Sequence, residues 1–124
     1  MRSVEHKMVN SLFGHGRPGR VGKNTVVAPT DTGGRVELHG NVIASYNALT
    51  GDLTVTLAGW PTVTTRSRVN AILDAWNSRH GHYEAPPRIY QAEHVQFIEE
   101  GDGPIEIDSR DVLEYHPPRP PAGA

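Results

Sequence analysis

The sequence contains no cysteine. Disulfide bonds and metal sites with thiolate ligands are therefore excluded. The absence of thiols leaves the redox compartment of the protein undetermined.

Long apolar runs are absent as well. No segment approaches the roughly 20 apolar residues that a transmembrane helix needs, and the N-terminus lacks the apolar core of a secretory signal. We therefore expect a cytoplasmic protein that has no membrane partner.

Lysine is scarce, with two lysines against ten arginines. A nearly neutral protein does not require that ratio, so we attribute it to a GC-rich coding sequence, typical of actinobacteria and their phages. The formal net charge of −2 argues against wholesale binding to nucleic acid, which favours a basic excess. Any basic patch must be local.

A length of 124 residues allows one domain with a modest core. Residues 1–13 fit a short amphipathic helix, residues 14–24 are rich in glycine and locally basic, and residues 117–124 are too rich in proline for regular structure. We expect an N-terminal extension and basic arm over 1–23, one α+β domain over 24–115 and a disordered tail over 116–124.

Alternating apolar residues predict several strands. The clearest is 53–57, where Leu53, Val55 and Leu57 face the core and two threonines face outward. The other expected strands cover 24–28, 35–39, 42–46, 88–90, 95–99 and 105–107, the last two as a hairpin. Residues 109–115 are expected to form a turn or a short helix.

One helix is expected over about 65–79. Its apolar stripe consists of Val69, Ile72, Leu73 and Trp76, spaced i, i+3, i+4 and i+7. Thr64 or Thr65 can cap the start, and His80-Gly81 is a plausible end. The fold class is therefore α+β, a mostly antiparallel sheet with one face packed on this helix.

Arg66 and Arg68 occupy the first turn of that helix, where the backbone dipole disfavours cations. One interpretation is an anion site, in which first-turn N–H groups, the hydroxyls of Thr64 and Thr65 and both guanidinium groups converge on a phosphate or carboxylate. The simpler alternative is that either arginine pairs with an acidic side chain or lies on Trp60. We favour the alternative.

The order of motifs resembles a family of small phage-encoded proteins of unknown function. The pattern consists of Asn24-Thr25, Leu38-His39-Gly40, a hydrophobic strand and Gly-Trp-Pro-Thr-Val-Thr-Thr-Arg-Ser-Arg-Val-Asn at 59–70. It covers about 24–108 and leaves out 1–23 and the tail. The resemblance implies an accessory protein of a phage or prophage and transfers no catalytic residue. It marks a candidate binding set, with Leu38 and His39 as neighbours on the sheet: Trp60, Thr64, Thr65, Arg66, Arg68 and Asn70.

Asn70 lies one helical turn after Arg66, so both side chains could point the same way. We favour a simpler role, in which Asn70 hydrogen-bonds the preceding loop.

Three sharper interpretations are rejected. A phosphate-binding loop before Thr25 fails, because the glycine spacing is too long and a strand follows where a helix is needed. His80, His82 and His94 could hold zinc or nickel, but no carboxylate or cysteine stands at a recognised spacing. No Ser-His-Asp signature occurs. We expect no enzyme activity, no metal and no cofactor.

Two function classes remain. The favoured one is a non-enzymatic module that binds a host or phage protein through strand edges and the Trp60 region, with self-association by the same route. The alternative is a nucleic-acid-binding accessory protein that uses Arg66 and Arg68 together with the basic arm of Arg17, Arg20 and Lys23.

Overall fold

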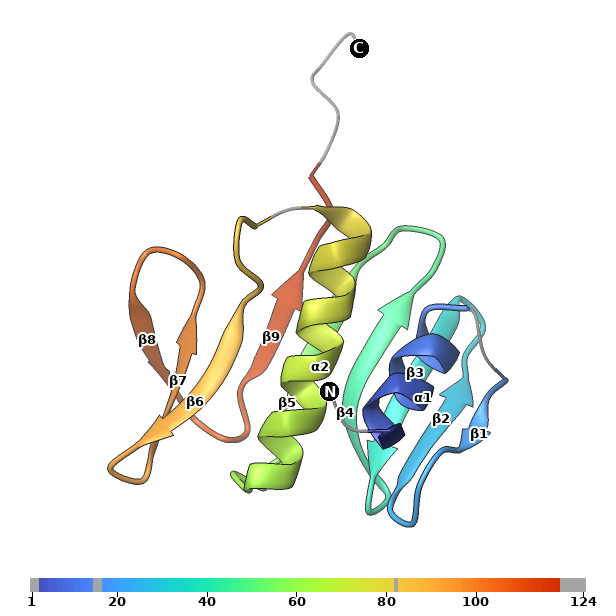
Figure 1. Ribbon diagram of the computed structural model, residues 1–124, viewed down its shortest axis with the longest axis horizontal. Coiled ribbons are helices and arrows are strands. Elements are labelled where there is room, and N and C mark those ends of the chain that lie inside the picture. Colours follow the sequence, from blue (N-terminus) through green and yellow to red (C-terminus); the bar gives the residue numbers. More distant parts are fainter. Residues whose placement is uncertain (1–2, 15–16, 82, 119–124) are drawn as a thin grey trace, which may run out of the picture.

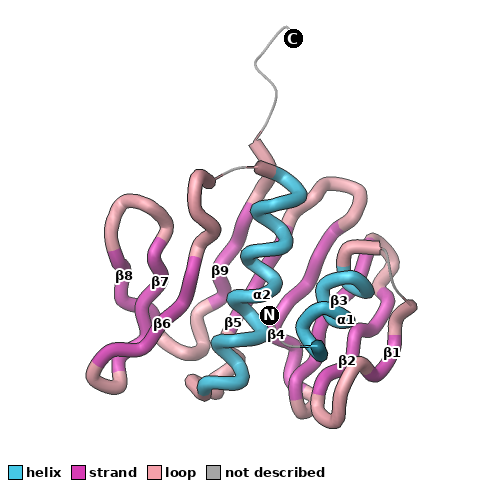
Figure 2. Tube along the Cα trace, in the orientation of Figure 1, coloured by secondary structure: helices cyan, strands magenta, loops and turns pink. Residues whose placement is uncertain are grey.

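A computed structural model describes residues 3–14, 17–81 and 83–118. These residues form two helices and nine strands in two antiparallel sheets (Figures 1 and 2). The helices are α1 (Ser3–Leu12) and α2 (Val63–His80). The strands are β1 (Gly19–Arg20), β2 (Thr25–Pro29), β3 (Gly33–Leu38), β4 (Asn41–Asn47), β5 (Leu53–Thr56), β6 (Arg88–Ala92), β7 (Val95–Glu99), β8 (Pro104–Ile107) and β9 (Val112–Tyr115). The α+β fold class is confirmed.

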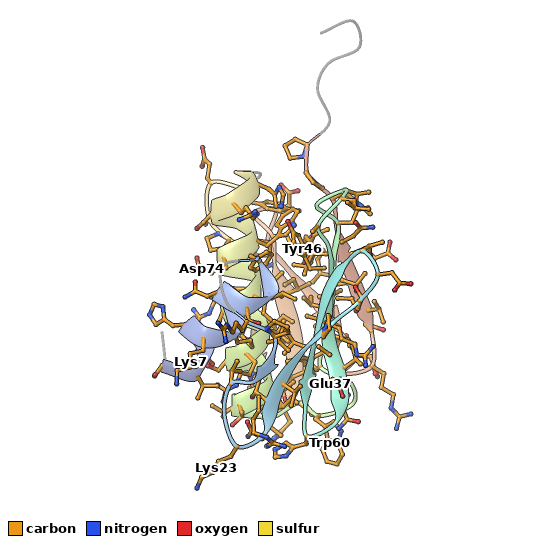
Figure 3. All side chains as sticks on the ribbon, turned by 90° about the vertical axis from the view of Figure 1, so that its right-hand side faces the viewer. Lys7, Lys23, Glu37, Tyr46, Trp60 and Asp74 are labelled. Atoms are coloured by element: carbon orange, nitrogen blue, oxygen red, sulfur yellow. The ribbon has the colours of Figure 1, made fainter. Side chains whose placement is uncertain are left out.

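The larger sheet has the strand order β1-β2-β3-β4-β5-β9. Both helices cover one face of it, and Figure 3 shows this two-layer arrangement edge-on. Leu53 and Val55 of β5 are buried against the helices, whereas Thr54 and Thr56 are half-exposed on the other side. This alternation, read from the sequence, is confirmed.

Helix α2 packs on the sheet through the expected stripe. Val69, Ile72, Leu73 and Trp76 each have 0% of their surface exposed. Gly81 ends the helix in the left-handed conformation, with φ at 62°, and its N–H donates to the Asn77 carbonyl oxygen. The helix is longer than expected and begins two residues earlier, at Val63.

The late strands form a sheet of their own, in the order β6-β7-β8. The sequence predicts these strands but not their separation from the larger sheet. Ile89 and Ile98 point into the core. The Asn70 side chain joins this sheet to α2, since its Nδ2 donates to the Ile89 oxygen at 2.9 Å and its Oδ1 accepts from the Ile89 N–H at 2.7 Å. Asn70 therefore bonds β6 rather than the preceding loop.

Strand β9 contradicts the expected turn or short helix over 109–115. Val112–Tyr115 pairs antiparallel with β5, with Leu53 opposite Tyr115 and Thr56 opposite Val112. Residues 108–111 do form a turn, in which the Asp111 N–H donates to the Asp108 oxygen. The strand depends on pairing with residues about 60 positions earlier, which a local pattern does not reveal.

The described residues among 1–23 pack on the rest of the chain, and α1 matches the short amphipathic helix expected over 1–13. Met8 and Leu12 of α1 are buried in the common core, and β1 pairs with β2. Residues 119–124 of the predicted tail lie outside the described residues. Within the described part of the chain, no helix is long and apolar enough to span a membrane.

Candidate functional site

A pocket of about 480 Å³ opens at one end of the larger sheet, below the N-terminus of α2. It brings together three of the six residues of the candidate set, Trp60, Thr64 and Thr65, and places Leu38 and His39 beside them. The pocket is lined by Leu38, His39, Asn41, Ile43, Leu57, Trp60, Thr62, Thr64 and Thr65.

The hairpin between β3 and β4 forms one wall. Leu38 and Asn41 are opposed at the end of the hairpin, and the two residues between them have positive φ angles, 50° for His39 and 79° for Gly40. Those angles match the type I′ turn that a two-residue hairpin favours. Asn41 Nδ2 donates to the His39 oxygen at 3.3 Å. The turn thus fixes His39 at the rim.

Trp60 forms the opposite rim. Ala58 and Gly59 turn the chain sharply after β5, with φ angles of 56° and 81°, and the Trp60 N–H donates to the Leu57 oxygen at 2.9 Å. The Trp60 side chain is nevertheless 58% exposed, and it lies at the end of the molecule in Figure 3. The backbone at Trp60 is therefore fixed by these turns, while its large apolar side chain remains exposed to solvent.

The helix start supplies the polar part of the lining. Thr62, not Thr64 or Thr65, caps α2: its Oγ1 accepts from the Thr65 N–H at 3.1 Å and lies 2.9 Å from the Thr65 hydroxyl. Thr62 directly precedes the first helical residue and has the extended backbone that is typical of an N-cap. Thr65 is 1% exposed, so its hydroxyl is unavailable to a ligand.

Thr62→Ala is expected to lower the free energy of unfolding by about 1 kcal/mol, because the Thr65 N–H loses its acceptor. The measurement is chemical denaturation of the variant beside Thr64→Ala. The Thr64 hydroxyl makes no cap bond, so that control is expected to stay close to the wild type. Equal losses in both variants would contradict the assigned cap.

The structure does not bring Arg66 and Arg68 together on one anion. Arg68 is 5% exposed, and its Nη1 donates to Glu5 Oε2 at 2.7 Å. Arg66 Nη1 instead donates to the Pro61 backbone oxygen and to two glutamine side-chain oxygens, at 2.9 to 3.1 Å. Both guanidinium groups are thus bonded to protein atoms, and pairing with a carboxylate is confirmed for Arg68.

Sequence reasoning missed Glu5. This side chain is 3% exposed and also accepts a hydrogen bond from the Ser67 hydroxyl at 2.6 Å. A signal was present, because Glu5 lies three and seven residues before Met8 and Leu12 and so shares the apolar face of α1. A lone carboxylate on such a face indicates a buried cationic partner.

The basic arm lies along the β1 edge of the larger sheet. Arg17 and Lys23 are exposed, and Arg20 of β1 donates to the Lys23 backbone oxygen at 2.7 Å. Arg66 and Arg68 belong to α2, and Arg68 is buried, so it does not extend the exposed charge of the arm.

The histidines singled out in the sequence do not form a metal site within the described residues. The His80 ring lies 3.2 Å from the Tyr46 hydroxyl and packs on Trp76. Burial, with a smaller contribution from Arg79, lowers the pKa of His80. His94 lies in the tight turn between β6 and β7. In Figure 1 this turn is at the bottom of the view, whereas α2 ends at His80 near the top. His82 lies outside the described residues.

Comparison with known proteins gives one match. A sequence profile described as "Kyanoviridae Gp96 protein" matches residues 1–113, including the first 23 residues that the resemblance left out. No curated protein and no solved structure matches the chain. Kyanoviridae are phages of cyanobacteria, so the match supports a phage origin and gives no support to an actinobacterial one. The chain belongs to the Kyanoviridae Gp96 family of phage proteins.

Proposed function

We propose that this phage protein is a non-enzymatic interaction module whose contact site is the Trp60 pocket. The pocket receives an apolar side chain of a host or phage protein. The observation that carries the proposal is a tryptophan 58% exposed at the rim of a pocket with apolar walls.

The chemistry of the lining favours a protein ligand. Leu38, Ile43 and Leu57 offer apolar walls, and the exposed Val63, at 66%, extends the apolar surface beyond the pocket. Tryptophan is among the residues that contribute most binding energy at protein interfaces. Polar groups at the rim, from His39 and Thr64, suit the hydrogen-bonding border of such an interface.

Rigidity adds to this case. Two tight turns place His39 and Trp60, and the Thr62 N–H donates to the Trp60 oxygen at 2.8 Å. A site held in shape before binding loses less conformational entropy when the partner docks.

Nucleic-acid binding is the second candidate and now depends on the basic arm. Arg68 forms an ion pair with Glu5, so the start of α2 offers fewer cations for phosphate binding than the sequence suggests. Exposed Arg17, Arg20 and Lys23 remain for phosphate contacts.

The test is capture of partners by tagged protein from phage-infected cyanobacterial lysate, with and without nuclease. Wild type is compared with Trp60→Ala and with Leu49→Ala, whose side chain is 81% exposed on a turn away from the pocket. We expect one stoichiometric protein that resists nuclease, is lost with Trp60→Ala and is retained with Leu49→Ala.

Nuclease-sensitive recovery that is lost in an Arg17→Ala, Arg20→Ala, Lys23→Ala variant would instead support the nucleic-acid alternative. A double alanine variant of Arg66 and Arg68 is a poor probe, because it leaves Glu5 buried without its cation.

A further inference from the structure

Charge is divided between the two ends of the molecule. Residues 84–116 contain nine carboxylates and two arginines, which gives a formal net charge of −7 with histidine neutral. All nine carboxylate side chains are exposed or half-exposed, and none is ion-paired with lysine or arginine among the described residues. Six of the nine lie on or directly beside β6, β7 and β8, and we call these six the acidic end: Glu93, Glu99, Glu100, Asp102, Glu106 and Asp108.

The opposite end is cationic. Four exposed cations lie on α1, β1 and the segments beside them, and Figure 3 views this side of the molecule. Among residues 3–38 the carboxylates are Glu5, which is buried and paired with Arg68, Glu37, which is paired with Arg35, and the exposed Asp31. We call the four cations the basic end: Lys7, Arg17, Arg20 and Lys23.

Each end also carries a strand edge that no other described strand covers. Strand β1 is one of the two outer strands of the larger sheet, with β9 the other, and β8 is one of the two outer strands of the smaller sheet, with β6 the other. The two strands lie at opposite ends of the long axis in Figure 1. Ile105 of β8 is 55% exposed. Uncovered edges of this kind accept further chains.

We propose that copies of this protein associate head to tail, the acidic end and β8 edge of one copy docking on the basic end and β1 edge of the next. Opposite potentials on the two surfaces steer them together. The contact joins two different surfaces, so it propagates into a ring or an open row of copies. It uses none of the residues of the Trp60 pocket and is independent of the proposed function.

Electrostatic attraction contributes most of this contact. Strand β1 has two residues, Gly19 and Arg20, and so offers few main-chain hydrogen bonds to a neighbour. The association should therefore weaken as salt shortens the screening length, from about 30 Å at 0.01 M to about 3 Å at 1 M.

The first experiment is sedimentation velocity over a concentration series at about 0.01 M and about 1 M salt. We expect the average mass to rise with concentration at low salt and to stay monomeric at high salt. A monomer at both salt concentrations overturns the proposal, and so does association that salt does not weaken.

The second experiment exchanges charges. One variant carries Lys7→Glu and Lys23→Glu, and the other carries Asp102→Lys and Glu106→Lys. All four side chains are exposed. Each variant alone should remain monomeric, and an equimolar mixture should form a one-to-one dimer, because one intact end of each kind remains. The matched control is Asp74→Lys on the outer face of α2, which should associate like the wild type. A monomeric mixture, or loss of association in the control, overturns the proposal.

Discussion

Glu5→Gln is expected to lower the free energy of unfolding by about 3–5 kcal/mol, the usual cost of leaving one member of a buried ion pair without its partner. Glu5 and Arg68 are 3% and 5% exposed, and their 2.7 Å contact joins α1 to α2. Glutamine keeps nearly the same shape but removes the negative charge. The remaining contact of Arg68, from its Nε to the Thr25 hydroxyl at 3.3 Å, is too weak to compensate.

The matched control is Glu37→Gln, which breaks an exposed ion pair with Arg35 at 3.2 Å. Solvent screens that pair, so we expect a loss of no more than about 1 kcal/mol. Denaturation by urea measures both variants. Similar losses for Glu5→Gln and Glu37→Gln would show that burial does not strengthen the α1–α2 pair.

Trp76→Ala is expected to cost about 3–5 kcal/mol of stability, the range for truncating a large buried aromatic residue. Trp76 is 0% exposed, and its indole N–H donates to the Gly51 oxygen at 2.8 Å. The substitution leaves a cavity between α2 and the sheet and removes the partner of a buried carbonyl.

Trp60→Ala provides a control with the same change of residue. Trp60 is 58% exposed, so its removal should change stability by no more than about 0.5 kcal/mol. Thermal and chemical denaturation of both variants make the comparison. If Trp60→Ala were as destabilising as Trp76→Ala, Trp60 would be a packing residue and not an available contact.

Local patterns predicted the elements whose burial repeats regularly. The stripe from Val69 to Trp76 and the alternation along β5 each combine one solvent side with one core side. In both cases the spacing of the apolar residues is enough to predict which side of the element is buried.

Long-range pairing explains the errors in the sheets. Strand β9 presents a weak local pattern, with Tyr115 the one residue of the strand that is fully buried. It becomes a strand because β5 lies beside it. The separation of β6, β7 and β8 into their own sheet depends likewise on contacts such as Asn70 with Ile89, far apart in sequence.

The candidate site was predicted in part. The sequence placed Leu38, His39 and Trp60 in one neighbourhood, and the pocket brings them together. It could not assign Arg68, because its partner Glu5 lies 63 residues away. We expected residues 1–23 to lie outside the domain, so Glu5 was not considered as a partner of Arg68. Without a visible partner for Arg68, an anion site was one possible explanation of its position.

A calorimetric titration of the captured partner against wild type, Trp60→Ala and Leu49→Ala tests whether the Trp60 pocket is the contact site. If Trp60 is the anchor of the contact, its truncation should cost at least about 2 kcal/mol, a weakening of roughly 30-fold. Leu49→Ala should bind like the wild type. Equal affinity of all three proteins would contradict the claim that the Trp60 pocket is the contact site.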